Sequence, residues 1–256
     1  MPIRNSRCRT IWSGKTPGLL LACALLAPLA ARADDDIAFD RPGIAFGTEV
    51  LAPGQFAWEQ GLPDYTRDDS GGASTEQYTL DSRLRLGLGA QWELQVAVDS
   101  YVWQHGDPRA RGGGDSQLAL KWALPSSNDD FTWALLGTYR AGTGRSAFSE
   151  GAARDLGLSM AWSLPHGRGV GLYLDVGRGV DGTVWTVSPN YTLHDDGRWM
   201  TYVEAGMTGG AEHERQLGGG VAWHVRPKVQ IDASLLRGLD ARSTDWQAGL
   251  GLSFAL

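Results

Sequence analysis

The side chains most able to carry acid–base or metal chemistry in this 256-residue chain are its five histidines, and they are scattered. No two of them have the spacing of a helical metal-ligand pair. No Gly-x-Ser-x-Gly elbow occurs, nor a His-x-Ser arrangement with a nearby Asn, so no hydrolase nucleophile can be paired with a base. The sequence therefore predicts neither a catalytic residue nor a metal or cofactor site. The five are His105, His166, His194, His213 and His224.

Two glycine triplets, residues 112–114 and 218–220, could suggest phosphate loops. Neither is followed by Lys-Ser/Thr or by a helical pattern, as a phosphate loop requires. We interpret the first triplet as a flexible part of a loop and the second as a site where chain segments pack closely.

Charged residues recur at every second position of strand-like stretches, and they are the remaining candidates for function. Across residues 78–103, polar residues such as Arg83 and Arg85 alternate with apolar ones on both sides of a tight reversal. A period of two describes a β-hairpin with one apolar face and one charged face. Nine charged residues on the polar face are candidates for lining a solute path: Arg83, Arg85, Asp99, Lys121, Arg140, Asp155, Asp175, Glu204 and Asp232.

The same alternation continues through the chain and predicts twelve strands. No stretch shows the continuous apolar run of a strand that is buried on both faces. Pro189 falls in the middle of the eighth strand and cannot donate to a ladder, so we expect a bulge or a different register there. The predicted strands are residues 55–62, 76–89, 92–103, 115–124, 131–140, 154–164, 169–178, 183–193, 199–208, 214–225, 228–237 and 244–256.

The connections between these strands alternate in length. Longer ones follow odd-numbered strands, as at residues 63–75 and 104–114, whereas even-numbered strands end in tight turns, as at residues 90–91 and 226–227. Long loops at one rim and tight turns at the other are typical of an up-and-down membrane barrel. The predicted fold class is all-β, a transmembrane antiparallel β-barrel of about twelve strands over residues 55–256, with both ends on the tight-turn side.

Strand length and tryptophan placement favour a membrane as the surroundings. Most predicted strands approach the ~9–11 residues that a tilted strand needs to cross a bilayer, and no apolar stretch after residue 33 reaches the ~20 residues of a spanning helix. Six of the eleven tryptophans lie near strand ends and suit the aromatic girdles at the two interfaces. The alternative is that they cap the core of a secreted β-sandwich. The six are Trp92, Trp122, Trp162, Trp199, Trp223 and Trp246.

The N-terminus has the pattern of a secretory signal peptide. A basic head, an apolar run over residues 19–30 and a small-residue site predict a signal peptide over residues 1–33, with cleavage before Asp34. Residues 34–54 show no sustained period. We predict that they form a periplasmic lead-in, and an extra strand at residues 44–51 is left open.

Cysteine and charge usage exclude several classes of protein. Cys8 and Cys23 both lie in the predicted signal peptide, so the exported chain has neither a disulfide nor a thiolate metal site. Its stability must come from another source, and a sheet closed on itself is one such source. Cys23 only weakly resembles a lipoprotein processing site. Because residues 1–33 hold five basic and no acidic residues, the net charge of −6 becomes −11 after cleavage. This acidic chain is not expected to bind nucleic acid.

The last predicted strand resembles an assembly signal. Gln247, Gly249, Leu252 and Phe254 are spaced like the polar-x-Gly-x-x-apolar-x-aromatic pattern that ends many bacterial outer-membrane barrels, although the chain continues to Leu256. The resemblance implies insertion by the outer-membrane barrel assembly machinery.

The candidate lumen charges divide by sign along the chain. The basic ones come from the second, fourth and fifth strands, and the acidic ones dominate from the sixth strand onward. In a closed barrel a basic-bearing wall would face an acidic wall, and the field between them would orient polar or zwitterionic solutes. The alternative is that these charges pair and plug the barrel. A barrel of twelve strands has a narrow lumen. It is wider than the lumen of an ~8-stranded barrel, which side chains fill, and narrower than that of an ~16-stranded aqueous porin.

Short motifs in a fixed order give the chain a family resemblance. They are Asp40-Arg41-Pro42, Pro53-Gly54-Gln55 with Glu59 and Gly61, Tyr65-x-Arg67-Asp68, Leu84-Arg85-x-Gly87-Leu88, Gly114-Asp115 with Lys121, Arg237-Gly238, and the ending Asp245-Trp246-x-x-Gly249-Leu250-x-Leu252-Ser253-Phe254. Together they resemble the bacterial outer-membrane family named for the meta-pathway of phenol degradation, whose members are described as transporters. The resemblance implies a barrel that admits small organic molecules, aromatic ones among them, and it carries over no substrate-binding residues.

The function that these patterns favour is passive diffusion of small molecules through an outer-membrane channel. Its expected partners are outer-membrane lipid, the assembly machinery and a small solute. A plugged structural or adhesive barrel is the alternative, because the loops at residues 63–75 and 141–153 are long enough for adhesion. An outer-membrane lipid hydrolase would need a nucleophile beside a base on the outward face, and the sequence offers no such pair.

Overall fold

The computed structural model describes residues 37–69, 73–106 and 108–256. The predicted signal peptide, residues 1–33, lies outside the described residues. Among the residues described, no helix has the length and apolar character that a helical membrane crossing requires.

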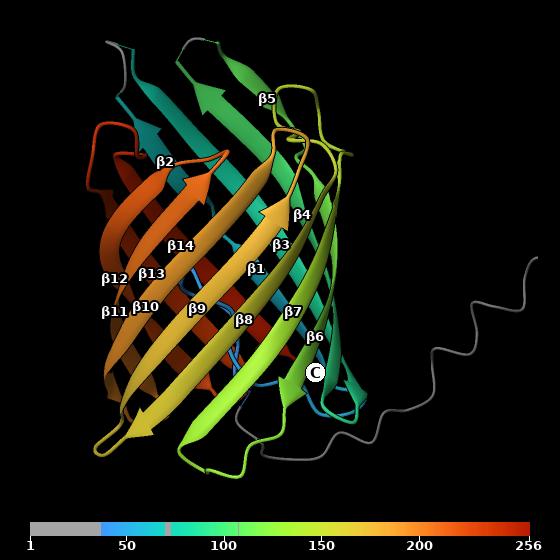
Figure 1. The fold of residues 1–256 in the computed structure, drawn as a ribbon, viewed down its shortest axis with the longest axis vertical. Coiled ribbons are helices and arrows are strands. Elements are labelled where there is room, and N and C mark those ends of the chain that lie inside the picture. The colour runs from blue at the N-terminus through green and yellow to red at the C-terminus, as the bar shows by residue number, and fades with distance from the viewer. Residues whose placement is uncertain (1–36, 70–72, 107) are drawn as a thin grey trace, which may run out of the picture. The chain divides into compact units, whose positions relative to one another are not determined.

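One antiparallel sheet contains all the described strands. They are β1 (Phe56–Gly61), β2 (Asp64–Asp68), β3 (Thr75–Gly89), β4 (Trp92–His105), β5 (Ala110–Gly112), β6 (Ser116–Leu124), β7 (Phe131–Ala141), β8 (Ala153–Leu164), β9 (Arg168–Arg178), β10 (Thr183–Asp195), β11 (Trp199–Gly210), β12 (Glu214–Arg226), β13 (Val229–Gly238) and β14 (Trp246–Ala255). From β6 to β14 each strand pairs with the next one along the chain. β4 pairs with β3 and β6, β3 pairs with β1, and β1 pairs with β14, so the sheet closes (Figure 1).

The fourteen segments occupy twelve positions around the barrel. β1 and β2 are successive parts of one position, because both pair with β3 and β14. β5 and β6 likewise both pair with β4. The prediction of a closed twelve-stranded antiparallel barrel is confirmed, and the β-sandwich alternative is wrong.

The predicted strands match the observed ones closely, with two omissions. β2 and β5 lie inside stretches that the sequence predicts as loops, residues 63–75 and 104–114. β2 reads Asp-Tyr-Thr-Arg-Asp and therefore lacks the apolar alternation that marks a strand. It is held by ladder hydrogen bonds to β3 and β14, which become its neighbours only when the barrel closes.

Apolar side chains point outward and charged ones point into the lumen. Leu84 and Leu118 are 41% and 52% exposed, whereas Arg85 and Lys121 are buried, at 1% and 0%. A soluble protein would reverse this pattern, because exposed leucine rows are unfavourable in water but not in lipid. The alternation in the sequence therefore describes a membrane barrel, in which apolar side chains face lipid and charged side chains face the lumen.

Pro189 lies within β10 and changes the ladder less than expected. Pairing with β9 continues through it, as Pro189 opposite Leu172. The ladder to β11 is interrupted beside Pro189 and resumes in the same register at Asn190 opposite Glu204. The expected bulge or changed register at Pro189 is therefore absent. Proline lacks a backbone N–H, and the ladder is interrupted only on the side of β11, where that N–H would have donated.

Candidate functional site

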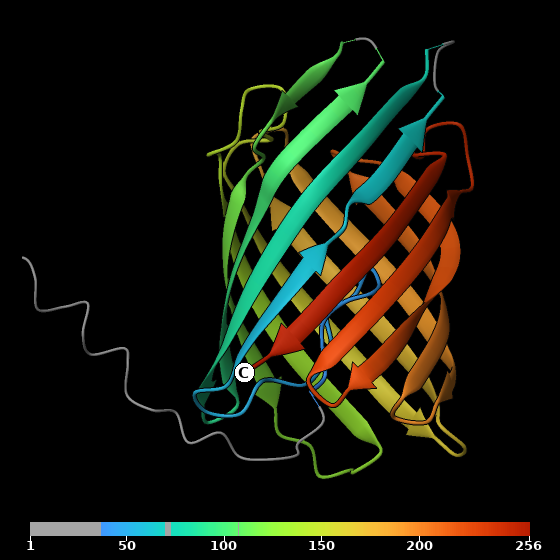
Figure 2. The same cartoon turned by 180° about the vertical axis from the view of Figure 1, so that it is seen from behind.

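The lumen contains a segment of the chain itself, residues 37–54, which we call the lead-in. In Figure 2 it is the blue coil, part of which lies inside the barrel and part along the tight-turn rim. Where it enters and leaves, Ile37, Phe39 and Leu51 form an apolar cluster with the adjoining ends of β1 and β14. The sequence predicts a periplasmic lead-in over residues 34–54. Lead-in residues 40–46 contact the inner wall of the barrel, and residues 44–51 form no strand.

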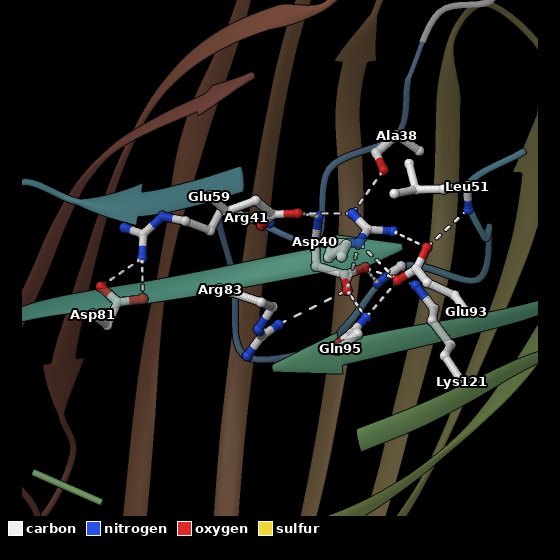
Figure 3. A network of polar contacts seen from close by, with 12 residues as sticks. Ala38, Asp40, Arg41, Leu51, Glu59, Asp81, Arg83, Glu93, Gln95 and Lys121 are labelled. Atoms are coloured by element: carbon white, nitrogen blue, oxygen red, sulfur yellow. Dashed lines mark hydrogen bonds and ion pairs between the residues drawn. The ribbon is translucent and has the colours of Figure 1, made fainter. Parts of the chain in front are cut away.

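Asp40 anchors the lead-in at the centre of a buried charge network (Figure 3). One carboxylate oxygen accepts a hydrogen bond from the Lys121 ammonium at 2.8 Å, and the other accepts one from the Gln95 amide at 2.8 Å. Guanidinium nitrogens of Arg85 and Arg83 lie 3.7 and 3.8 Å from the same carboxylate. A buried carboxylate is stable only with partners of this kind.

Arg85 connects this anchor to two further carboxylates. Its guanidinium bonds Glu59 at 2.7 Å and Glu93 at 2.8 Å, and all three side chains are fully buried. Glu59 accepts the backbone N–H groups of Asp40 and Arg41, both at 2.9 Å, so the wall carboxylates also bind the lead-in backbone. Glu93 does the same for the N–H of Leu51 at 2.8 Å. The cluster holds three acids and three bases and is formally neutral.

Arg41 forms a second anchor between the lead-in and the barrel wall, and unlike the Asp40 cluster this anchor is not formally neutral. Its guanidinium lies 2.9 Å from Asp64, 3.2 Å from Asp81 and 3.5 Å from Asp232. One guanidinium group therefore lies between three carboxylates, which come from three different strand positions of the barrel wall. The arrangement leaves a net negative charge on this side of the lead-in.

The lead-in also reaches the opposite wall. The N–H of Ile44 donates to Glu204 on β11 at 2.9 Å. The Phe46 ring packs edge-on against Tyr173 of β9, with centroids 5.5 Å apart, and the Lys121 ammonium lies 5.4 Å from the Phe46 centroid. Because the lead-in is bound on both sides, it crosses the lumen.

Three of the lumen cavities follow one another from the long loops to the tight turns, and a fourth, about 340 Å³, lies between the lead-in and strands β2 and β11–β14. The loop-side chamber, about 530 Å³, lies among the long-loop ends of β8, β9 and β10. The central chamber, about 290 Å³, shares Asp155 and Asp175 with it and touches the lead-in. The turn-side chamber, about 460 Å³, lies toward the tight turns. Asp40, Arg41 and Phe46 line both the central and the turn-side chambers, so the lead-in forms the boundary between them.

The nine candidate lumen residues fall into two groups in the structure. Five contact the lead-in, and four lie toward the long-loop end, where Arg140, Asp155 and Asp175 line the loop-side chamber and Asp99 lies opposite Asp81 on the β3–β4 ladder. The lead-in contacts are Arg83, Arg85, Lys121, Glu204 and Asp232. Arg85 and Lys121 are bound to buried carboxylates and do not face an open bore as the two-wall interpretation expects.

Sequence reasoning did not include the lead-in side of this site. In the sequence Asp40, Arg41 and Glu59 stand out only as parts of family motifs, and Asp64 does not stand out. The available signal was a pair of opposite charges in an aperiodic segment. Its partners lie on strands far along the chain, so only barrel closure identifies them.

Aromatic side chains gather at both rims. Trp92 stacks on Trp122 with centroids 5.1 Å apart, and Trp199 stacks on Trp223 at 5.2 Å, each across two neighbouring strands at the tight-turn end. Trp162, also at that end, packs against Phe131. Trp246 lies at the long-loop end, where the Arg237 guanidinium is 4.5 Å from its ring centroid.

The C-terminal motif occupies both faces of β14. Leu252 and Phe254 share the face of Leu250, which is 55% exposed, and the ring of Phe254 packs on Trp58 of β1 at 5.2 Å. Gln247 and Gly249 are on the other face. Gly249 has no room for a side chain, because a Cβ there would lie 2.8 Å from the Ser234 hydroxyl.

The histidines take part in local contacts at the rims. His213 pairs with Asp240 at 2.9 Å in the loops of the long-loop rim. The hydrogen bond from His213, together with the N–H of Arg242, lowers the pKa of Asp240 to about 2. In the described part of the chain, no group of three or more His, Cys, Asp or Glu side chains could hold a metal ion.

Solved structures of bacterial outer-membrane proteins resemble this barrel. An outer membrane channel from Pseudomonas putida F1 has a TM-score of 0.67 at 16% identity, and the match covers 84% of this chain and 99% of that one. The KdgM porin in complex with disordered oligogalacturonate has a TM-score of 0.54 at 9% identity, covering 78% and 98%. The NanC porin has a TM-score of 0.51 at 11% identity, covering 78% and 100%. At these identities the likeness concerns the fold.

No curated protein matches the chain. A family model does match, over residues 39–256, and this range contains the barrel together with the lead-in from Phe39 onward. The chain therefore belongs to the family described as "Putative MetA-pathway of phenol degradation", a family of porin-like outer-membrane β-barrels, as the resemblance of its motifs predicted.

Proposed function

We propose that this protein is a passive channel for small organic molecules in the bacterial outer membrane, with its narrowest part at lead-in residues 40–46. The observation that carries the proposal is the row of three chambers along the lumen, two of which meet at the lead-in. The porins and the channel of similar fold support it. The predicted signal peptide and C-terminal motif support export and insertion by the assembly machinery.

The lining of the loop-side chamber favours cationic and neutral solutes over anions. Acidic residues outnumber basic ones there, and Arg140 is bound to Glu150. The remaining acids attract cations at the entrance, because a low-dielectric wall strengthens the field of fixed charges. In this proposal Asp155 and Asp175 contact the solute, whereas Arg85 and Lys121 hold the lead-in.

The central chamber suits a flat apolar group. Phe46, Tyr173 and Leu136 line it beside charged residues. Aromatic rings stack or meet edge-on at centroid distances of about 4.5–7 Å, so a small aromatic solute could exchange with the Phe46–Tyr173 contact. Together with the family description, this lining supports aromatic compounds as one class of solute.

Swelling of proteoliposomes in iso-osmotic solutes tests the proposal. We expect swelling in lysine hydrochloride to be faster than in sodium glutamate, and swelling in phenylalanine to be measurable. Asp155→Asn with Asp175→Asn should reduce the preference for lysine without abolishing swelling. Equal rates for lysine and glutamate in the wild type would contradict the proposed charge selection.

A plugged structural barrel is the second candidate, and the bound lead-in is the observation that favours it. The two functions differ in one measurement. If the wild type does not swell in any solute but Asp40→Asn does, the lead-in is a plug in the resting protein. If neither protein swells, the channel proposal is wrong and the structural role is favoured.

A further inference from the structure

A cavity of about 710 Å³ at the long-loop rim plays no part in the proposed solute path. It is bounded by the end of β4, by β5 and by the loop between β7 and β8. Trp103 on β4 pairs with Arg111 on β5 and stacks on Tyr78 of β3, with centroids 5.2 Å apart. Tyr78 is on the outward face of β3, the face of the exposed Leu84, so Trp103 and Arg111 border the cavity from the outside of the barrel.

The lining of this cavity is basic and aromatic. It contains Arg109, Arg111 and Arg145, with Tyr101 and Trp103 beside them, and the described lining residues include no Asp or Glu. None of the three arginines forms an ion pair with a carboxylate of the described residues, although most other arginines at this rim, such as Arg67 and Arg237, do. Because these guanidinium groups have no carboxylate partner among the described residues, they are available to bind an anion from outside the protein.

The three arginines come from two separate parts of the chain, and backbone contacts hold them together. The N–H of Arg145 donates to the carbonyl of Gly113, and its guanidinium donates to the carbonyl of Arg111, both at 2.8 Å. The Arg145 side chain packs on the face of β5 opposite to the Arg111 side chain, since a Cβ at Gly112 would be 2.6 Å from its Cδ and Gly112 pairs with the buried Val102. The cavity is thus a fixed feature of the folded barrel.

We propose that this cavity binds the phosphorylated headgroup of a glycolipid in the outer leaflet of the outer membrane. Guanidinium forks match phosphate oxygens in pairs, and basic clusters beside a membrane bind anionic headgroups. Tyr101, which is 41% exposed, and Trp103 add aromatic rings to this site, and aromatic side chains are enriched where headgroups meet acyl chains. The long-loop rim faces the cell exterior in barrels of this kind, so the outer leaflet supplies the ligand. This inference rests on the proposed outer-membrane location.

The test is binding of purified lipid A to the refolded full-length barrel in detergent, measured by native mass spectrometry. The probes are bisphosphorylated lipid A, dephosphorylated lipid A and inorganic phosphate as competitor. The variants are Arg111→Gln and the double variant Arg109→Gln/Arg111→Gln. Arg242→Gln is the matched control, because Arg242 is exposed at the same rim but does not line the cavity. Heat-dependent mobility on a gel verifies that each variant is folded.

We expect one tightly bound bisphosphorylated lipid A, with affinity reduced about tenfold or more in the double variant and unchanged in Arg242→Gln. Dephosphorylated lipid A should bind as weakly to the wild type as lipid A binds to the double variant. Equal affinity of wild type and double variant would overturn the proposal. So would complete competition by inorganic phosphate, which would indicate a site for the free anion. Liposome swelling by the same variants should be unchanged, so a failure here is separate from a failure of the channel proposal.

Discussion

The Asp40 carboxylate and the Lys121 ammonium form a 2.8 Å ion pair inside the barrel, with side chains that are 1% and 0% exposed. The pair joins an aperiodic segment before the first strand to β6, 81 residues later in the chain. It makes the lead-in part of the lumen wall, so in the proposed channel the width of the solute path depends on this ion pair.

Replacement of Asp40 by Asn should loosen the lead-in and raise the single-channel conductance. The variant leaves Lys121 without its carboxylate partner, whereas Arg85 keeps Glu59 and Glu93. Loss of one member of a buried ion pair costs about 3–5 kcal/mol. Glu49→Gln removes the same charge from an exposed position of the lead-in and is the matched control. Planar-bilayer recordings measure the effect. Identical conductance of Asp40→Asn, Glu49→Gln and wild type would show that the lead-in does not limit the path.

Replacement of Arg41 by Gln should make the channel more cation-selective. Arg41 is the cation that serves Asp64, Asp81 and Asp232, so its loss adds a net negative charge to the lumen. The reversal potential across a KCl gradient measures the change. Arg67→Gln is the control, because Arg67 pairs with Asp69 at the exposed rim. The hypothesis fails if both variants shift the reversal potential equally.

Replacement of Gly87 by Ala should destabilise the exit of the lead-in. A Cβ at this position would lie 2.1 Å from the carbonyl oxygen of Ala52 and 2.4 Å from that of Leu51, which are backbone atoms that cannot turn away. We expect the free energy of unfolding to fall by about 1–3 kcal/mol, as in other overpacked sites. Gly137→Ala is the control, since its Cβ would meet nothing within 4 Å. Urea unfolding in lipid vesicles compares the two, and equal stabilities would exclude a tight contact at Gly87.

The loop between β7 and β8 should stay attached to Asp115 at mildly acidic pH. Asp115 accepts the N–H groups of Gly144 at 2.8 Å and Glu150 at 3.0 Å. Burial alone would raise the pKa of Asp115, but these donors outweigh it and lower the pKa below its usual value. Because the pKa is lowered, the contact gives its full stabilisation at any pH above the ordinary carboxyl pKa of about 4. This stabilisation is lost only as the pH falls through the lowered pKa.

The amide NMR shift of Gly144 in micelles provides the measurement. Between about pH 7 and about pH 4 we expect it to remain constant. Asp115→Ala should move this shift at every pH, whereas Asp129→Ala, at an exposed tight turn, should not move it. Titration of the Gly144 amide with an ordinary carboxyl midpoint would contradict the assignment.

Local pattern in the sequence was sufficient for the barrel and for the direction of its side chains. A period of two requires no knowledge of distant residues, so the outward leucines and the inward Arg85 and Lys121 can be read directly. β2 was missed because its five residues carry no apolar alternation, and its ladder partners lie on β3 and β14.

Tertiary structure alone decided what fills the lumen. The lead-in has no period, and its position is set by buried charges, since Asp40 and Arg41 must meet Lys121 and Asp232 to be stable away from water. These partners are separated by tens to hundreds of residues and become neighbours only after β1 pairs with β14. A hydrophobic pattern describes one strand at a time, whereas an ion pair across a barrel exists only in the closed sheet.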